Sequence, residues 1–136
     1  MRKEFVIGCD PDTFKSGVAI WSKEKGLFLN EFTLWDAFKY LNVHGSKSLI
    51  RLEAGHKDKR TWHKGGNAMA KKVGANNEIG RQIEKFCIEN AFDLQLVKPC
   101  RLSNVNHESF CKITGWNLNI KTNPERRVAG LLCWNK

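Results

Sequence analysis

Three acidic residues stand where a folded chain can bring their carboxylates together. Asp10 closes the apolar run FVIGCD, Glu53 closes the run SLIRLE, and Glu125 follows Asn123-Pro124 at the start of a helical pattern. Carboxylates held close together repel one another unless a cation lies between them. Such oxygen ligands suit Mg²⁺ or Mn²⁺, and a pair of these ions can promote phosphodiester hydrolysis. The three acids therefore predict a divalent-metal site with nuclease chemistry.

Each acid also has an explanation that involves no metal. Asp10 precedes Pro11 and suits a turn, and Glu53 could be a solvated charge at a sheet edge. The helix dipole favours an acid at position 125, and Thr122-x-x-Glu125 matches a capping box. Spacing alone leaves both explanations open for each residue. The positions of the strands and the helix that carry the acids distinguish the two explanations.

The elements follow from the spacing of apolar residues. Apolar runs and alternation predict strands at Glu4–Asp10, Gly17–Ser22, Gly26–Thr33, Ser48–Glu53 and Asp93–Val97. Helical spacing predicts helices over Leu34–Val43, Asn67–Asn90 and Asn106–Thr114, and a last one from Asn123-Pro124 to the chain end. The first three strands are linked too closely to be anything but an antiparallel meander.

These elements predict an α/β fold with a mixed five-stranded sheet. Three antiparallel strands are joined by two parallel ones, and helices cover both faces of the sheet. In such a sheet the first and fourth strands are parallel neighbours, so Asp10 and Glu53 emerge at one edge. The last helix can bring Glu125 beside them. The length of 136 residues suits a single domain, residues 1–136.

The charge balance indicates a polyanionic partner. The chain has 23 Lys and Arg against 14 Asp and Glu, a formal net charge of +9. An excess of this size suits nucleic acid, although a basic soluble protein with no such partner would show it too. No signal peptide or membrane-length apolar run is present, and the five cysteines show no C-x-x-C pair. We therefore expect a cytoplasmic protein with reduced thiols and no membrane contact.

A basic segment follows the Glu53 strand and should border the same edge as the acids. Its lysines and arginines can neutralise phosphates, and its tryptophan can stack on an unpaired base. An ordinary solvated loop with the tryptophan packed inward is the alternative. The predicted nucleic-acid-binding residues, with one more on the helix that follows, are Lys57, Lys59, Arg60, Trp62, His63, Lys64, Lys71, Lys72 and Arg81.

Several motifs together resemble a known family. VIGCDPDTFKSGVAIW is similar to the first motif of RuvC-type Holliday junction resolvases, in the ribonuclease H-like superfamily, and LIRLEAG is similar to their second. VGANNEIGRQIEKFCIEN and LQLVKP resemble the helix and strand that come next. FCKITGW and TNPERRVAG resemble the end of short, phage-type members. The resemblance covers nearly the whole chain and depends on the order and spacing of the motifs.

The resemblance implies a metal-dependent endonuclease that acts on branched DNA as a homodimer. Asp10 and Glu53 would be metal ligands, and Glu125 would match the first acid of the final helix. Lys98 would match a basic residue near the scissile phosphate. Trp35, Phe38 or the face of the Asn67–Asn90 helix could form the dimer surface, although core packing explains them equally well.

Two positions depart from the family pattern. Val128 stands where the final helix normally offers a second acid, and Asp12 replaces a glycine after the first motif's Asp-Pro. The loss at Val128 keeps open a second class of function, a junction-binding protein without turnover. A pre-ribosomal RNA nuclease of the same superfamily is a further alternative. An actin-like phosphotransferase would need two such domains, and this chain has the length of one.

Overall fold

The computed structural model describes residues 3–57 and 67–136 and contains every strand and helix predicted from the sequence. The strands are β1 (Phe5–Asp10), β2 (Ser16–Ser22), β3 (Gly26–Phe32), β4 (Ser48–Glu53) and β5 (Asp93–Val97). The helices are α1 (Leu34–His44), α2 (Asn67–Glu89), α3 (His107–Thr114) and α4 (Pro124–Cys133). The last helix ends earlier than predicted, because the backbone leaves the helical conformation at Trp134.

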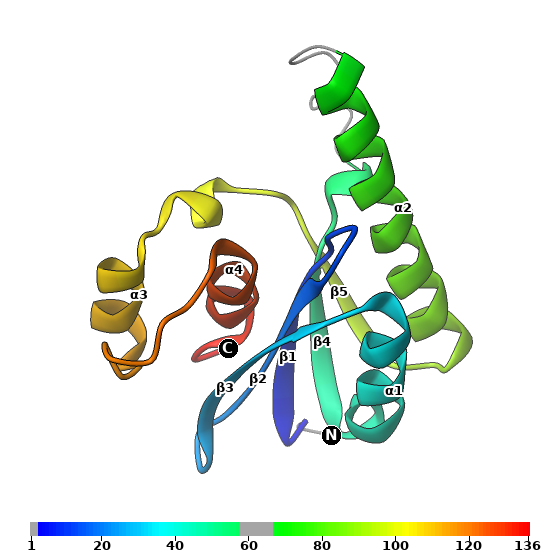
Figure 1. Ribbon diagram of the computed structural model, residues 1–136. Coiled ribbons are helices and arrows are strands. Elements are labelled where there is room, and N and C mark those ends of the chain that lie inside the picture. The colour runs from blue at the N-terminus through cyan, green and yellow to red at the C-terminus, as the bar shows by residue number, and fades with distance from the viewer. Residues whose placement is uncertain (1–2, 58–66) are drawn as a thin grey trace.

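The five strands form one mixed sheet in the order β3-β2-β1-β4-β5. β1 pairs with β2, and β2 with β3, in antiparallel register. β4 lies parallel to both β1 and β5. The predicted meander of three strands plus two parallel strands is confirmed. The carboxyl ends of β1, β4 and β5 consequently point to the same end of the sheet (Figure 1).

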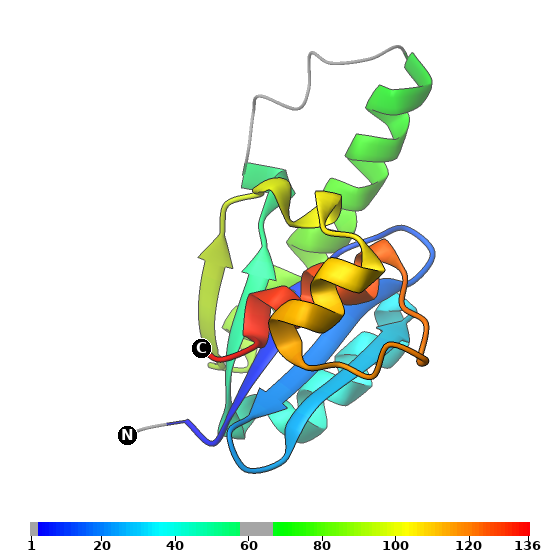
Figure 2. The same ribbon diagram turned by 90° about the vertical axis from the view of Figure 1, so that its left-hand side faces the viewer.

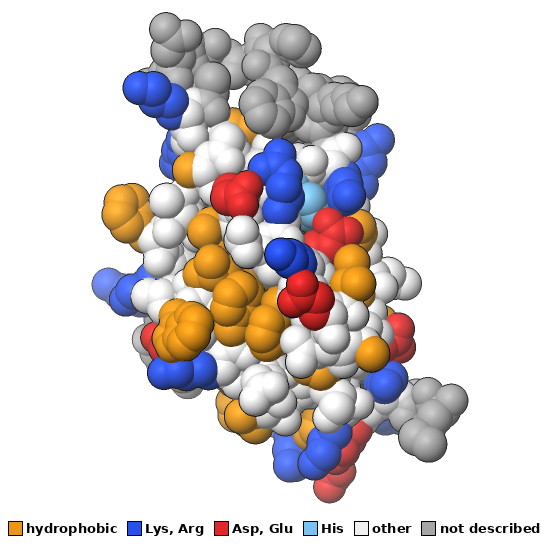
Figure 3. Space-filling view, turned by 90° about the vertical axis from the view of Figure 1, so that its right-hand side faces the viewer, with side chains coloured by type: hydrophobic (Ala, Val, Ile, Leu, Met, Phe, Trp, Pro, Cys, Tyr) orange, Lys and Arg blue, Asp and Glu red, His pale blue; other side chains and the backbone are white. Residues whose placement is uncertain are grey.

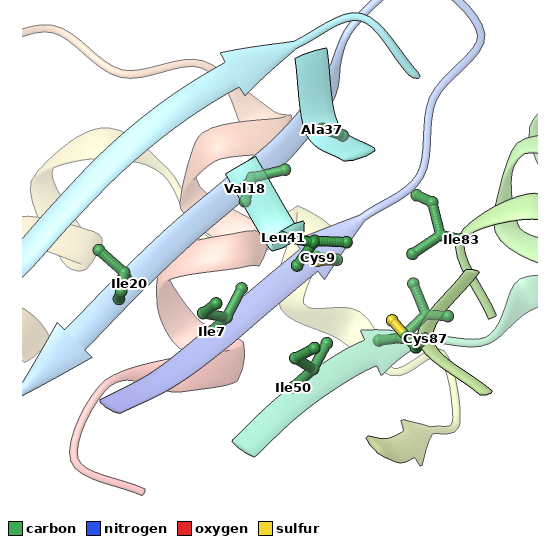
Figure 4. Packing of buried hydrophobic residues seen from close by; sticks show 10 residues of the cluster. Ile7, Cys9, Val18, Ile20, Ala37, Leu41, Ile50, Ile83 and Cys87 are labelled. Carbon is green, nitrogen blue, oxygen red and sulfur yellow. The ribbon is translucent and has the colours of Figure 1, made fainter. Parts of the chain in front are cut away.

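Helices cover both faces of the sheet, as predicted. α1 and α2 lie on one face, and α4, with α3 outside it, lies on the other (Figures 1 and 2). On the first face the larger part of the core is built from alternate residues of β1, β2 and β4 packed against both helices (Figure 4). Its buried members include Ile7, Val18, Leu41, Ile50 and Ile83.

The backbone of α4 packs directly against the sheet at two glycines. A Cβ atom at Gly8 of β1 would lie 2.0 Å from the carbonyl oxygen of Ala129. A Cβ atom at Gly17 of β2 would lie 2.1 Å from the carbonyl oxygen of Glu125. Neither position has room for any other residue unless α4 moves away. The two glycines therefore set how close the first turn of α4 comes to the end of β1.

The start of α4 shows why the helix begins at this point. The side chain of Asn123 accepts a hydrogen bond from the backbone N–H of Arg126, and Pro124 occupies the first turn. The capping box suggested for Thr122 and Glu125 is wrong, because Asn123 supplies the cap. Thr122 instead accepts a hydrogen bond from Arg127. Glu125 is thus left with its carboxylate available in the first turn.

The two candidate residues for a dimer surface have different environments. Phe38 stacks on Phe86 of α2, with ring centroids 4.5 Å apart, and belongs to the core. Trp35 is 68% exposed. On the face that carries α1 and α2, hydrophobic side chains gather near the middle, while Lys and Arg are scattered around them (Figure 3). No helix in the described ranges is long and apolar enough to cross a bilayer.

Replacing Gly8 with alanine should displace α4. The Gly8→Ala variant is expected to lose about 1–3 kcal/mol of unfolding free energy, because the new methyl group overlaps backbone that cannot rotate away. Urea unfolding measures this loss. Gly74→Ala is the matched control, since a Cβ atom there meets nothing within 4 Å and alanine favours a helix. Equal stability of Gly8→Ala and the unmodified protein would show that α4 does not rest on β1 here.

Candidate active site

The strand register brings Asp10 and Glu53 to adjacent positions. The last paired residues of β1 and β4 are Cys9 and Leu52, and each acid is the next residue on its strand. Asp10 also pairs with Gly17 of β2. Because neighbouring parallel strands keep their residues in step, both carboxylates leave the sheet at the same level.

Both acids lie on the face of the sheet that α4 covers. Side chains two residues apart on a strand share a face. Gly8, two residues before Asp10, contacts α4, and Arg51, two residues before Glu53, donates a hydrogen bond of 3.1 Å from Nη1 to the Leu132 carbonyl of α4. The contact between Gly17 and Glu125 places the first turn of α4 over the residue paired with Asp10. Three acids distant in the chain thus lie at one end of the sheet.

The electrostatics of Asp10 reflect this gathering. Burial is the main cause that raises the pKa of Asp10 to about 8, and the charges of Glu53, Glu125 and Asp12 act in the same direction. Burial also raises the pKa of Glu53. Both groups therefore hold a proton more tightly than an aspartate or glutamate in water. A cation among them would reverse this effect, because it stabilises the ionised carboxylates.

A neighbouring acid, Glu31, is paired with a basic side chain, unlike the three candidate ligands within the described part of the chain. Glu31 of β3 pairs with Gly17 in the sheet, and its carboxylate lies 3.2 Å from Nε of Arg126 and accepts a hydrogen bond from Asn123. Across residues 3–57 and 67–136, no salt bridge of this kind reaches Asp10, Glu53 or Glu125. The three candidate ligands are thus separated from the basic side chains that pair with other acids.

The donor set suits a hard divalent cation in the kind of ligand that it offers. Three carboxylates with no basic partner in the described structure, one of them strongly desolvated, are what Mg²⁺ or Mn²⁺ binds. No three His, Cys, Asp or Glu side chains in the described ranges are already grouped closely enough to hold an ion. Asp10, Glu53 and Glu125 would have to close around a cation.

Three further residues that the family resemblance singled out are not part of the cluster. Val128, at the position of the family's second helical acid, is 2% exposed on the buried side of α4, so it offers no ligand. Lys98 follows β5 and is exposed, and Pro99 rather than Lys98 lines the cavity beside the acids. Asp12 lies in the turn between β1 and β2, where its backbone N–H donates to Ser16.

A cavity of about 250 Å³ lies at the carboxyl ends of β1 and β4, where Asp10 and Glu53 line it together with residues of α2; Glu125 is not in its lining. The residues that line it are Asp10, Pro11, Glu53, Gly55, His56, Val73, Asn76, Asn77, Gly80 and Pro99. An apolar cavity of about 330 Å³ at the other end of β1, around Phe5, Trp21 and Tyr40, has no acidic residue in its lining. The chemistry of the smaller cavity makes it the candidate active site.

Sequence reasoning missed the wall that α2 contributes to this cavity. Asn77, Gly80, Ile83 and Cys87 are all buried, so the buried stripe within residues 71–89 of α2 begins with a polar residue. His56 fills the space left by Gly80 and shares a 2.8 Å hydrogen bond between its Nε2 and Glu84. The sequence signal that could have revealed this wall is Asn77, which shares a helical face with Ile83 and Cys87.

The predicted nucleic-acid-binding residues are placed only in part. Lys57, Lys71 and Lys72 are exposed, and Lys57 Nζ lies 3.6 Å from Glu84. Arg81 is exposed and forms a 3.1 Å ion pair with Glu78 on the same helix. The remaining residues of the basic segment lie outside the described residues: Lys59, Arg60, Trp62, His63 and Lys64.

Comparison with known proteins supports the fold. No family model matches the sequence, and no curated protein matches it either. Among solved structures, the chain is similar to T. thermophilus RuvC in complex with a Holliday junction substrate, with a TM-score of 0.57 and 12% sequence identity. The match covers 95% of this chain and 92% of that one. The mixed sheet with helices on both faces is thus the ribonuclease H-like fold.

The buried carboxyl of Asp10 should make the metal-free protein less stable as pH rises. Its native pKa of about 8 lies above that of an unfolded aspartate, near 3.9, so the native state binds the proton more tightly. This stabilisation is complete below about pH 4 and is lost as pH rises through about 8. In EDTA, the difference in unfolding free energy between Asp10→Asn and the unmodified protein should shift in favour of Asp10→Asn by more than about 1 kcal/mol as the pH rises from about 5 to about 9.

Chemical unfolding at several pH values measures this difference. Asp93→Asn is the control, because Asp93 lies at the opposite end of the sheet and is exposed. Its stability should follow the pH profile of the unmodified protein. A constant difference between Asp10→Asn and the unmodified protein at all pH values would contradict the buried, acid-facing environment of Asp10.

Proposed function

We propose that the protein is a metal-dependent endonuclease that cleaves phosphodiester bonds in branched DNA. The observation that carries the proposal is the convergence of Asp10, Glu53 and Glu125 at one end of a ribonuclease H-like sheet, with no salt bridge to them in the described structure. Clustered carboxylates of this kind are poor partners for nucleic acid on their own. Carboxylates that hold divalent cations can instead take part in the hydrolysis of a phosphodiester.

In this proposal the three acids share the work of holding Mg²⁺ or Mn²⁺. Such ions, when bound, would supply activation of a water molecule and stabilisation of the charge that develops on the phosphate oxygens. Asp10 and Glu53 would be ligands held by the sheet, because they extend from the ends of adjacent strands. Glu125 approaches from the first turn of α4, where the capped helix start holds it. Lys98, exposed beyond β5, is proposed to bind the phosphate from the cavity's open side.

Branched DNA is the proposed substrate for two reasons. The net charge of +9 suits a polyanion, and the similar T. thermophilus RuvC structure contains a Holliday junction substrate. Exposed lysines at 57, 71 and 72 lie beside the cavity or on the start of α2, where they can contact phosphates. A homodimer suits a junction, because its two-fold symmetry presents two scissile strands in equivalent positions.

A junction-binding protein without turnover is the second candidate. It is favoured by Val128, which is buried at the position where the family resemblance leads us to expect a further acid. With one ligand fewer, a second metal site would be weaker. The protein would then hold branched DNA and distort or protect it rather than cut it.

Cleavage of a synthetic four-way junction separates these two functions. With Mg²⁺ or Mn²⁺ the protein should cut the junction, and Asp10→Asn and Glu53→Gln should each slow cutting roughly hundredfold or more, because each removes a cation ligand. Glu78→Gln, at an exposed glutamate of α2, is the matched control and should retain activity. Tight junction binding without cutting would support the second candidate. Cutting that persists in Asp10→Asn would contradict the proposed site.

Charge reversal tests the surface beside the cavity. The triple change of Lys57, Lys71 and Lys72 to Glu should weaken junction binding and flatten the slope of log affinity against log salt, by about one for every phosphate that is no longer neutralised. Fluorescence anisotropy at several salt concentrations measures both. The control is the same change at Lys23, Lys39 and Lys47, which alters the net charge equally from other elements. If both triples shift the slope equally, these lysines form no specific surface.

A further inference from the structure

We propose that Asn77 binds the substrate: its side-chain amide donates a hydrogen bond to a phosphate oxygen of the strand that enters the acidic cavity. The inference rests on the proposed nuclease function and adds a contact from α2 to it. Asn77 lines the same cavity as Asp10 and Glu53. Its Nδ2 is buried and has no hydrogen-bond partner among the described residues.

Asn77 is held in place by the buried stripe of α2. It is 5% exposed and lies three residues before Gly80 and six before Ile83, both of which are buried. Its Oδ1 faces Gly55, where an added Cβ atom would lie 3.4 Å away. The amide is therefore fixed between α2 and the segment that follows Glu53. Such a side chain needs little reorganisation to meet a ligand.

A buried donor without a partner is a costly feature in a folded protein. Leaving an amide N–H unsatisfied costs about 1–3 kcal/mol, and native structures contain few such groups. In a helix, a buried position in an apolar stripe would be filled more stably by leucine or alanine. A ligand oxygen that completes the hydrogen bond in the bound state explains why a polar group at this position is useful.

Other polar side chains of the cavity wall form hydrogen bonds within the protein through one of their polar atoms. Asn76 accepts hydrogen bonds of 2.9 Å and 2.5 Å from the backbone N–H and the hydroxyl of Thr13. His56 bonds to Glu84 through Nε2. Asn76 thus fixes the turn that follows Asp10, and His56 fixes the segment after Glu53 against α2. Among the described residues of the cavity lining, Asn77 has the side-chain amide nitrogen that is both buried and without a hydrogen-bond partner.

A phosphate oxygen is the ligand that this chemistry favours. The carboxylates, prolines and glycines of the cavity lining offer no side-chain donor to an anion, so its side-chain donors are those of Asn77, Asn76 and His56. Once cations neutralise the carboxylates, a phosphate can enter, and a neutral amide can bind it without adding charge. Asn77 would then orient the strand relative to Asp10 and Glu53.

Two substitutions at Asn77 test the contact. Asn77→Ala removes the donor, and Asn77→Asp keeps the shape but replaces the donor with an acid. We expect Asn77→Ala to bind a four-way DNA junction roughly tenfold more weakly in Ca²⁺ buffer, and Asn77→Asp more weakly still because it repels phosphate. Asn90→Ala, at the exposed end of α2, is the matched control and should bind normally. Single-turnover cleavage in Mg²⁺ should fall in parallel for both Asn77 variants.

Two further measurements distinguish phosphate binding by Asn77 from a role in cation binding or in stability. Thermal shift with Mg²⁺ alone shows whether Asn77 serves the cation: tighter Mg²⁺ binding by Asn77→Asp, with junction binding retained, would overturn the proposal. Lower thermal stability with unchanged junction binding and cleavage would assign Asn77 a structural role and also overturn it. If the unmodified protein neither binds nor cuts junctions, the proposed function fails. If it does both and the Asn77 variants match it, only this inference fails.

Discussion

The close approach of α4 to the sheet is the constraint on which the candidate site depends. Gly8 and Gly17 leave the helix backbone in direct contact with β1 and β2, at distances that no Cβ atom allows. That contact carries the first turn of α4, and Glu125 with it, to the residue paired with Asp10. A helix packed at the usual distance through larger side chains would hold Glu125 farther from the two strand-borne acids.

The same packing brings several acids close together, and among the described residues only one of them, Glu31, is paired with a basic side chain. Glu31, Asp10 and Glu53 follow one row across β3, β1 and β4, with Gly17 between the first two. Arg126 neutralises Glu31, whereas burial and like charges raise the pKa of Asp10. A fold selected for stability alone would place a basic or apolar residue at position 10. The retained repulsion is understandable if a divalent cation completes the site.

Much of the fold could be predicted because its signals are local. The apolar runs that end at Asp10 and Glu53 and the Asn123-Pro124 start of α4 specify the elements, and their order specifies the mixed sheet. The close contact at Gly8 and Gly17 could not be predicted, because a glycine in a strand can mark a bulge, a tight bend or the close approach of another backbone. The role of Asn77 was also out of reach, since its burial depends on how α2 lies against Gly55. Thr122 failed as a cap because Asn123, one residue later, competes for the same helix start.

A crystal structure with Mn²⁺ tests the central claim most directly, because the anomalous signal locates each ion independently of the protein. The account predicts Mn²⁺ bound directly by the carboxylates of Asp10 and Glu53, with Glu125 turned toward the same ion or toward a second one beside it. Mn²⁺ bound only elsewhere, or an empty site at saturating Mn²⁺ with the three carboxylates apart, would contradict it.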